Sequence, residues 1–435
     1  MLLVSTQPHS GLVKAPSTKR ALYLKDPILL PNGDAIVFSG KLISHSGTPE
    51  EYFKDYFNDD RTTLSDLREE MQNWDGSWAF IYVSFAGTIY CLTDPLGICQ
   101  LYYNRFGEIS TTINPLVNID SDGKIDQLYM SEVAKWGYNT DDRTPWESIR
   151  RVTPNHMHMF MGSELFMVEP KPYFSYRWDQ PNYGSLASQL RALVRLSVDL
   201  HLKDLPDGPI AVLLSGGLDS SIISACLLDL CGKRGISDRL RFYSINNADD
   251  KPYVEEFAQQ FGLGSRLTYL SYDLSKIDFE EALANNETPV DLGSMVPNQR
   301  MFSLIPEKVI FTGDGPDELF GGYRRIDQYD SQKSDVFQEL SYYHLPRLAK
   351  AAEYYGKDLR CPYLGYDIIR MALSLPFEQR KHKSILKEAF KDVIPASIIN
   401  RPKLPLKNDW IRKDPMEYRM KLIEEFMKIV EKLAI

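Results

Sequence analysis

The sequence predicts a two-part α/β protein: a β-rich N-terminal part and a C-terminal part built on an open parallel sheet. The N-terminal part holds short runs of aromatic and β-branched residues, separated by Gly, Asp and Pro turns. From residue 184 onward, continuous apolar runs alternate with helical stretches. Such runs are typical of strands that a parallel sheet buries on both faces.

The chain is long enough for two domains, each with its own core. A Pro- and Tyr-rich segment at 170–183 is the predicted linker, which gives domains of residues 1–175 and 184–435. In the first domain we expect strands at 35–38, 78–84, 88–92 and 101–103, and helices at 50–58 and 64–72.

The second domain is expected to begin with alternating strands, turns and helices and to end in helices. We expect buried strands at 210–214, Leu240–Ile245, Leu267–Leu270 and Val309–Phe311. The expected helices are 192–200, 222–230, 252–261, 368–375, 385–391 and 416–433.

Composition excludes several classes of protein. The net charge of -9, with acidic residues spread along the chain, argues against nucleic acid or an anionic membrane as the main partner. No apolar run approaches the roughly 20 residues that span a bilayer. The first residues lack a basic region leading into a long apolar stretch, so we expect no signal peptide. Five scattered cysteines indicate reduced thiols and no cysteine metal site. We therefore expect a cytoplasmic protein.

The turn SGGLDSS at 215–221 directly follows the first buried strand and begins a helix. Gly216 and Gly217 let the backbone approach a phosphate chain, because no Cβ is in the way. Backbone N–H groups at the helix N-terminus then face the anion, and three serine hydroxyls add donors. Asp219 predicts a cation such as Mg²⁺ between its carboxylate and the phosphates. A plain strand–helix turn is the alternative, which the embedded aspartate disfavours.

A second glycine-rich turn, GDGPDELFGGY at 313–323, follows the strand Val309–Phe311 and holds three acidic residues. Both turns should lie at the carboxyl edge of the sheet, where ligands bind in open parallel sheets. Asp219 and Asp317 can then share metal ions, while Asp314 is free to transfer a proton. The alternative is a solvated acidic turn, which the glycines and proline around the acids disfavour.

Together the two motifs resemble the asparagine synthetase family, whose relatives include β-lactam synthetases and lasso-peptide cyclases. SGGLDSS looks like the pyrophosphate loop of N-type ATP pyrophosphatases, and GDGPDELFGGY looks like the family's second loop. The downstream segments RCPYL, KSILK, IPASI and RPK are similar to family motifs in the same order. GSWAFIY and DPLGICQLYY resemble the second half of the family's glutaminase domain.

The resemblance implies an Ntn-hydrolase-like α+β domain followed by an α/β ATP-pyrophosphatase synthetase domain, with ATP and Mg²⁺ as cofactors. It implies that a small-molecule or peptide carboxylate forms an acyl-adenylate and pyrophosphate, and that ammonia or an amine then yields an amide. A homodimer is compatible with this interpretation. The implied ATP-binding residues are Leu213, Leu214, Ser215, Gly216, Gly217, Asp219, Ser220, Ser221, Ile245 and Gly313.

Five side chains carry the implied chemistry. Asp219 and Asp317 match the family's metal-binding aspartates, and Lys383 matches the lysine that stabilises negative charge in both half-reactions. Asp314 stands where asparagine synthetases have the glutamate that handles the proton of the nitrogen nucleophile. Asp358 replaces a glutamate before RCPYL and is a further catalytic candidate.

Departures from the family motifs predict a different nitrogen source and acceptor. The glutaminase nucleophile is a cysteine at the first mature position, whereas this chain begins Met1-Leu2 and has SGK at 39–41 in place of an Asn-Gly-Glu motif. We therefore expect a structural N-terminal domain and the use of ammonia or an amine. Gly365 replaces an aspartate near the acceptor pocket, so the acceptor need not be aspartate.

Three alternatives remain open. Amide formation can be intramolecular, as in β-lactam synthetases and lasso-peptide cyclases. The domain can be a non-catalytic ATP-binding module, although retention of four charged site residues argues against this. Other enzymes that share the first loop, such as NAD synthetase, GMP synthetase or tRNA-thiolating enzymes, do not predict GDGPDELFGGY.

Overall fold

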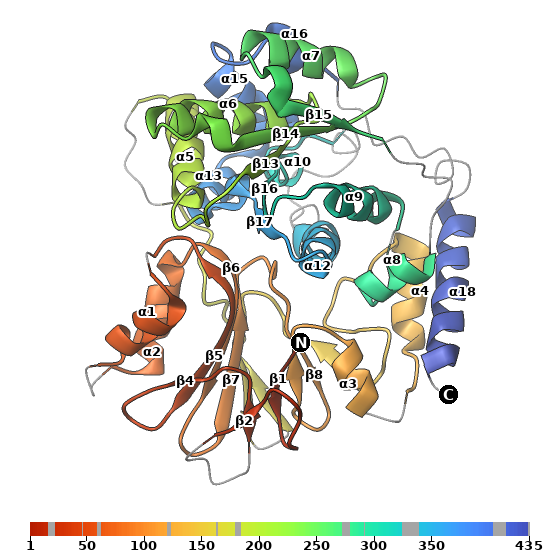
Figure 1. Cartoon of the computed structure of the whole chain (residues 1–435). Helices are drawn as coiled ribbons and strands as arrows, with labels where there is room; N and C mark the ends of the chain where they lie inside the picture. Colours follow the sequence, from red (N-terminus) through yellow and green to blue (C-terminus); the bar gives the residue numbers. More distant parts are fainter. Residues whose placement is uncertain are drawn as a thin grey trace.

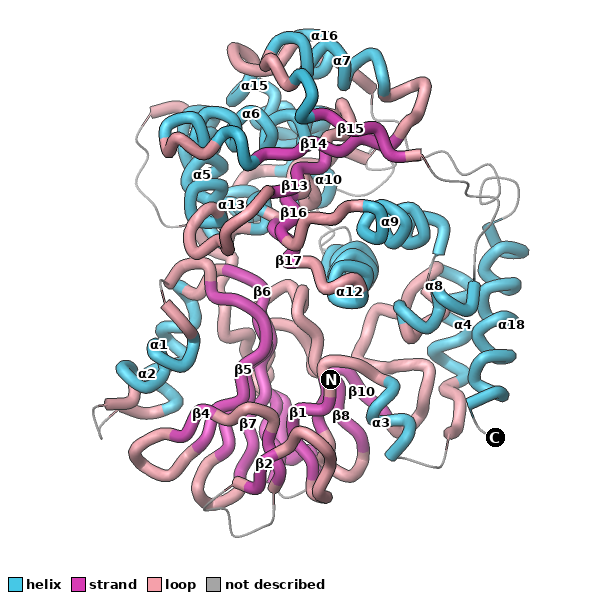
Figure 2. The backbone as a smooth tube through the Cα atoms, viewed as in Figure 1, coloured by secondary structure: helices cyan, strands magenta, loops and turns pink. Residues whose placement is uncertain are grey.

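The computed structural model shows two parts joined along a broad interface (Figure 1). Two antiparallel sheets form the N-terminal part, and a parallel sheet between helices forms the C-terminal part (Figure 2). The structure describes residues 1–15, 22–45, 47–58, 62–119, 123–161, 164–178, 184–271, 279–290, 292–323, 339–402 and 415–433. Lys403 of the RPK motif and part of the expected linker lie outside these residues.

The N-terminal part contains two six-stranded antiparallel sheets, ordered β10-β8-β9-β1-β3-β2 and β12-β11-β7-β6-β5-β4. The first consists of β1 (Leu2–Ser5), β2 (Val13–Lys14), β3 (Tyr23–Leu24), β8 (Tyr102–Asn104), β9 (Ile109–Ser110) and β10 (Ile149–Arg151). The second consists of β4 (Ile28–Leu29), β5 (Ala35–Leu42), β6 (Gly76–Val83), β7 (Thr88–Thr93), β11 (His158–Met161) and β12 (Glu164–Val168).

Side chains of β6 alternate between two hydrophobic clusters, as the period of two in a strand requires. Ala79 and Ile81 pack in the cluster that includes residues of both sheets, whereas Trp78 and Phe80 pack in a cluster with residues of α1 and α2. Helices α1 (Pro49–Tyr56) and α2 (Leu64–Glu70) both begin with a threonine capping box. Helices α3 (Asn114–Ile119) and α4 (Gln127–Trp136) lie between strands β9 and β10 in the chain.

The C-terminal sheet is parallel throughout and runs in the order β15-β14-β13-β16-β17. Its strands are β13 (Ile210–Leu213), β14 (Leu240–Ile245), β15 (Leu267–Leu270), β16 (Val309–Phe311) and β17 (Asp358–Arg360). The strands at 210–213, 240–245, 267–270 and 309–311 confirm the sequence prediction. The edge strand β17 was not expected.

Helices cover this sheet and connect its strands (Figure 1). The longer ones are α5 (Leu186–His201), α6 (Leu218–Lys233), α7 (Lys251–Gln260), α8 (Phe279–Asn286), α9 (Leu292–Leu304), α12 (Leu345–Tyr354), α13 (Tyr366–Ser374), α15 (Ser384–Phe390) and α18 (Pro415–Leu433). Short helical turns include α10 (Pro316–Leu319), α14 (Phe377–Arg380) and α16 (Ala396–Ile399). None of the helices in the described part of the chain is long and apolar enough to cross a membrane.

One hydrophobic cluster lies wholly within the N-terminal part, and two others contain residues of both parts. One continuous cluster contains Trp78 and Phe80 of the N-terminal part together with residues of the parallel sheet and its helices. Phe174 and Tyr366 meet across this cluster with ring centroids 4.6 Å apart. Helix α18 returns to the N-terminal part, where Phe426 packs on Trp146. Apolar faces of the two parts are therefore buried against each other.

Candidate active site at the carboxyl edge of the parallel sheet

The two glycine-rich turns meet at the carboxyl edge of neighbouring strands, as expected. β13 and β16 pair in parallel, and the turns follow the ends of these strands. Gly313 lies so close to the start of α6 that a Cβ there would be 2.7 Å from the Ser220 backbone nitrogen. Real Cβ atoms essentially never approach so closely, so only glycine fits between the turns.

The first turn is shaped for an anion at the N-terminus of α6. Gly216 has a φ of +67°, which favours glycine. No side chain caps the helix at Gly217, and an anion bound at this end would face the first turn of the helix. The Ser220 hydroxyl accepts from the Ser215 backbone N–H at 3.1 Å and lies 3.0 Å from the Ser215 hydroxyl. These bonds hold the turn in shape.

The expected ATP-binding residues differ in their exposure. Ser221 is completely buried on α6, and its expected contact with ATP stays a prediction. The Leu214 side chain is buried and its N–H donates to the Tyr243 carbonyl at 2.8 Å. Leu213 and Ile245, by contrast, are half-buried at the ends of β13 and β14. These two therefore remain candidates for contact with a nucleotide.

Three charged side chains converge between the turns. The Lys383 amine lies 2.5 Å from an Asp219 carboxylate oxygen and 2.6 Å from one of Asp317. All three side chains are largely buried. Two carboxylates from separate turns thus converge on one cation, which is the arrangement that sharing a metal ion requires. A Cβ on Gly322 would be 2.0 Å from Asp317 Oδ1 and 2.3 Å from Lys383 Cε, so glycine leaves room for this group.

Lys383 is held in this position by a strained backbone. Its φ is +58° and that of His382 is +55°, both in the left-handed region that non-glycine residues seldom adopt. The Lys383 N–H donates to the Phe320 carbonyl and the His382 N–H to the Gly321 carbonyl, each at 2.8 Å. The second turn therefore fixes the lysine directly. Strain of this kind persists where surrounding structure enforces it and concentrates at functional sites.

Asp314 is exposed at the mouth of the second turn. One carboxylate oxygen accepts from the Thr312 hydroxyl at 2.6 Å, and that hydroxyl also lies 3.7 Å from Cys361 Sγ. Tyr363, in the RCPYL segment, donates to the Asp219 backbone carbonyl at 3.2 Å. The RCPYL segment therefore contacts both turns, and its side chains support Asp314 and Asp219.

The structure places Asp358 at the start of β17, away from the two turns. It begins β17 beside Val309, whereas the turn holding Asp314 follows the other end of β16. Both Asp358 oxygens accept from the Arg360 guanidinium, at 2.8 and 2.7 Å. The reason is strand direction: residues that begin a parallel strand lie at the edge opposite to the ligand-binding one. The catalytic role expected of Asp358 stays a prediction.

Comparison with known proteins assigns the family. The sequence model described as asparagine synthase matches residues 189–355 and 335–426. The chain belongs to the asparagine synthase family. It is 26% identical over 266 residues to the asparagine synthetase [glutamine-hydrolyzing] of Bos taurus, covering 54% of this chain and 47% of that protein. It is 28% identical over 215 residues to the chicken protein of the same description (Gallus gallus), covering 45% and 38%.

A third relative extends the match into the N-terminal part. The probable asparagine synthetase [glutamine-hydrolyzing] of Acanthamoeba polyphaga mimivirus is 24% identical over 393 residues, covering 83% of this chain and 68% of the viral protein. The chain spans about half the length of the vertebrate relatives it matches. The family assignment confirms the expected fold class, with antiparallel sheets followed by the parallel sheet of the asparagine synthase domain.

Behind the second turn of this asparagine synthase domain lies a polar network that sequence reasoning missed. Glu318 is buried, and it accepts from the Tyr323 hydroxyl and lies 3.3 Å from His344 Nε2. Burial, followed by the nearby Asp317 carboxylate, raises the pKa of Glu318 to about 8. Glu318 was visible within the motif, but nothing in the sequence connects it to His344. The network braces the turn that presents Asp317.

Two further contacts brace the first turn. The Arg401 guanidinium donates to the Ser215 carbonyl at 3.2 Å and pairs with Asp250. It also lies over the Tyr253 ring, 4.3 Å from the centroid. Arg401 belongs to the RPK segment, which the sequence analysis identified as a family motif. The motif did not indicate which residues Arg401 contacts, because these come from distant parts of the chain.

The donor set suits a magnesium ion that is held jointly with phosphates. Among the described residues, no group of three or more His, Cys, Asp or Glu side chains forms a metal site by itself. Asp219 and Asp317 supply two carboxylates, and Mg²⁺ is usually bound by one or two carboxylates together with substrate phosphates. The residues therefore fit an ion that arrives with ATP.

Proposed function

We propose that this chain is an ATP-dependent ligase that forms an amide bond through an acyl-adenylate, with AMP and pyrophosphate as products. The convergence of Asp219, Asp317 and Lys383 beside the open N-terminus of α6 supports this most directly. The turn favours a phosphate chain, and it lacks the lysine with which kinase loops hold the terminal phosphates.

In the first step, an oxygen of the substrate carboxylate attacks the α-phosphorus of ATP, and the bond to pyrophosphate breaks. The N–H groups at the start of α6 hold the phosphates, and Lys383 stabilises the negative charge that develops. Asp219 and Asp317 would hold Mg²⁺, which supplies charge neutralisation on the phosphates when bound.

In the second step, an amine nitrogen attacks the acyl carbon, a C–N bond forms, and the C–O bond to AMP breaks. The nitrogen must lose a proton. Asp314 is exposed at the mouth of the second turn and accepts a hydrogen bond from the Thr312 hydroxyl just before the turn, so it is placed to accept that proton.

We further propose that ammonia or an amine, not glutamine, supplies the nitrogen. Cys99 and Cys361 are the cysteines that line the cavity between the two parts. Burial raises the pKa of the Cys99 thiol well above its ordinary value and that of Cys361 to about 12. Neither provides the thiolate that glutamine hydrolysis by a cysteine requires.

The nucleotide products test the proposed function. The purified chain is incubated with Mg-ATP and a panel of candidate acids, and nucleotides are resolved by chromatography while acyl-adenylates are sought by mass. We expect AMP and pyrophosphate. ADP as the main product would overturn the mechanism, and absence of any acid-dependent turnover would favour the non-catalytic ATP-binding module.

A further inference from the structure

Arg401 is a largely buried arginine that contacts the first turn from outside it. Its side chain is 7% exposed. One terminal nitrogen donates to the Ser215 carbonyl at 3.2 Å and the other to the Asp250 carboxylate. The guanidinium also lies over the Tyr253 ring, 4.3 Å from its centroid. Both terminal nitrogens and one face of the guanidinium are thus engaged within the protein, so Arg401 is suited to shape the turn and not to bind a ligand itself.

The start of α7 packs against the same turn and holds Arg401 in place. A Cβ on Gly216 would lie 3.1 Å from the Asp250 carbonyl oxygen, so this part of α7 lies directly on the turn. One carboxylate oxygen of Asp250 accepts from Arg401, and the other accepts from the Asn247 side-chain amide at 3.2 Å. These contacts form a chain of polar groups that ends on the Ser215 carbonyl.

The bond from Arg401 fixes the direction of a backbone N–H group in the turn. Ser215 and Gly216 share a planar trans peptide unit, in which the C=O and N–H groups point in opposite directions. Because Arg401 holds the carbonyl, the Gly216 N–H must point away from the guanidinium. The φ of +67° at Gly216 then leads the chain into α6, at the end of the helix that favours an anion.

The contribution of Arg401 is one of geometry and not of net charge. Asp250 pairs with the guanidinium and compensates its positive charge. The pair as a whole therefore adds little charge beside a phosphate group. Lys383, by contrast, lies between two carboxylates that also suit a metal ion. What remains for Arg401 is the orientation of the peptide between Ser215 and Gly216.

We propose that Arg401 is a positioning residue for the pyrophosphate part of ATP, because it directs the Gly216 N–H toward the phosphates on the first turn. The proposal rests on the proposed function and names a residue that prepares the site for its leaving group. Pyrophosphate occupies this site as part of ATP before the reaction and as a product after it. Loss of the N–H contact should therefore weaken binding of both, and the affinity for the substrate acid should not change.

Titration with magnesium pyrophosphate tests this role without turnover. Calorimetry of the full chain compares the wild type with Arg401→Met and Arg401→Lys. We expect both variants to bind pyrophosphate at least about tenfold more weakly, the scale of one hydrogen bond to a charged group. Lysine keeps the positive charge but lacks the planar fork that reaches two acceptors. Wild-type affinity in Arg401→Lys would show that charge alone suffices and would overturn the positioning role.

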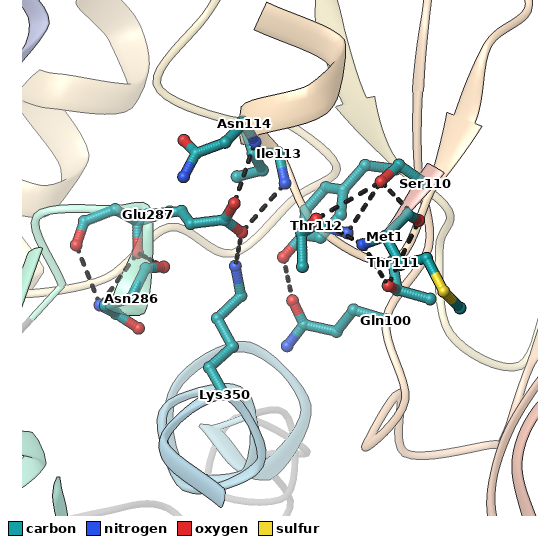
Figure 3. Close-up of polar contacts among 12 residues, drawn as sticks. Met1, Gln100, Ser110, Thr111, Thr112, Ile113, Asn114, Asn286, Glu287 and Lys350 are labelled. Atoms are coloured by element: carbon teal, nitrogen blue, oxygen red, sulfur yellow. Dashed lines mark hydrogen bonds and ion pairs between the residues drawn. The ribbon is translucent and has the colours of Figure 1, made fainter. Parts of the chain in front are cut away.

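Two matched controls separate positioning from general stability. Arg191→Lys changes an arginine of α5 that pairs with Asp392 and lies over the Phe390 ring. Lys350→Met breaks a buried ion pair with Glu287, 2.7 Å long, whose carboxylate also accepts two backbone N–H groups of the N-terminal part (Figure 3). Lys350→Met should lower the thermal unfolding midpoint, and both controls should bind pyrophosphate with wild-type affinity.

Wild-type affinity in Arg401→Met, absence of pyrophosphate binding in the wild-type chain, or an equal loss of affinity in Lys350→Met would overturn the proposal. Exchange of pyrophosphate into ATP adds a kinetic measurement. In Arg401→Lys the KM for pyrophosphate should rise about tenfold while the KM for the acid stays unchanged, and an equal rise in both would indicate a structural role only. ADP as the main product of ATP would overturn the proposed function, whereas the titrations still decide whether Arg401 prepares a pyrophosphate site.

Discussion

Buried carboxylates are stabilised differently in the two parts of this molecule. In the N-terminal part, Asp94 accepts backbone N–H bonds from Trp78, Leu96, Ile98 and Cys99, at 2.9 to 3.3 Å. In the C-terminal part, Asp219 and Asp317 face each other across two turns with the Lys383 amine between them. The first arrangement joins a loop to the neighbouring strand β6 through backbone N–H groups. The second depends on the Lys383 side chain, which is distant in sequence. A ligand such as a metal ion could take the place of its amine between the carboxylates.

The difference indicates where function resides. A carboxylate surrounded by its own backbone has little capacity left for a ligand, although burial still raises the pKa of Asp94 to about 6. Carboxylates that converge on a side-chain cation have oxygens that can also accept a metal ion, while the lysine interacts with phosphate. Substitutions in the C-terminal group should therefore change chemistry, and those in the N-terminal group should change stability.

The largest expected effect is that of Lys383→Met. Removing the amine eliminates charge stabilisation in both steps, and groups of this kind contribute roughly 100- to 1,000-fold in rate. Turnover should fall by that factor, measured as AMP release, while the circular dichroism spectrum stays unchanged. Lys391→Met is the matched control, because Lys391 is exposed and pairs with Glu388. A near wild-type rate in Lys383→Met would remove this lysine from the site.

Asp314→Asn should separate the two steps. Asparagine keeps the size and hydrogen bonding of the side chain but cannot accept a proton at neutral pH. Pyrophosphate exchange should persist, whereas amide formation should fall about 100-fold, the usual scale for general base catalysis. Asp219→Asn should lose both activities, because both depend on bound phosphate. Equal loss of both activities in Asp314→Asn would show that Asp314 only holds the turn.

Gly322→Ala tests the packing around the charged group. The new Cβ would lie 2.0 Å from Asp317 Oδ1, so the carboxylate must move away from Lys383. A displacement of about 1 Å can reduce rate up to roughly 100-fold, and we expect a loss of about 10- to 100-fold in AMP release. Gly232→Ala in α6 is the control, since its nearest contact would be an ordinary 3.6 Å. Equal rates in both variants would refute the tight packing.

The smallest effect concerns Asp75, a carboxylate of the N-terminal part that meets the Tyr366 N–H of the C-terminal part at 3.4 Å. Burial raises its pKa to about 7 from an ordinary value of 3.8. The folded state therefore binds more protons than the unfolded state between about pH 4 and 7, and this contribution to stability falls as pH rises through that window.

Asp75→Asn removes this titration. Its thermal unfolding midpoint should match that of the wild type near pH 4 and exceed it at pH 8, with the difference growing between the two. Pyrophosphate exchange at 25 °C should not change. A pH-independent difference in midpoint would mean that Asp75 acts through its hydrogen bonds and not through its charge.

The sequence by itself determined the strand–turn–helix order and the pairing of the two glycine-rich turns. A continuous apolar run such as Ile210–Leu213 predicts a buried strand, and parallel strands bring their carboxyl ends to one edge. The proximity of Asp219 and Asp317 follows from these local rules. The short strands β2, β3 and β17 were not predicted, because pairing with neighbours and not their own pattern defines them.

Only the tertiary structure decided which charged residues meet. Lys383 is 164 residues from Asp219 in sequence, and a strained backbone held by the second turn places its amine between the aspartates. Asp358 looked equally suitable in sequence, but β17 begins there and its side chain lies at the opposite edge of the sheet, beside Arg360 and Lys41. The reason is physical: sequence motifs record residue types, whereas contacts between distant segments depend on strand direction and on which apolar faces are buried together.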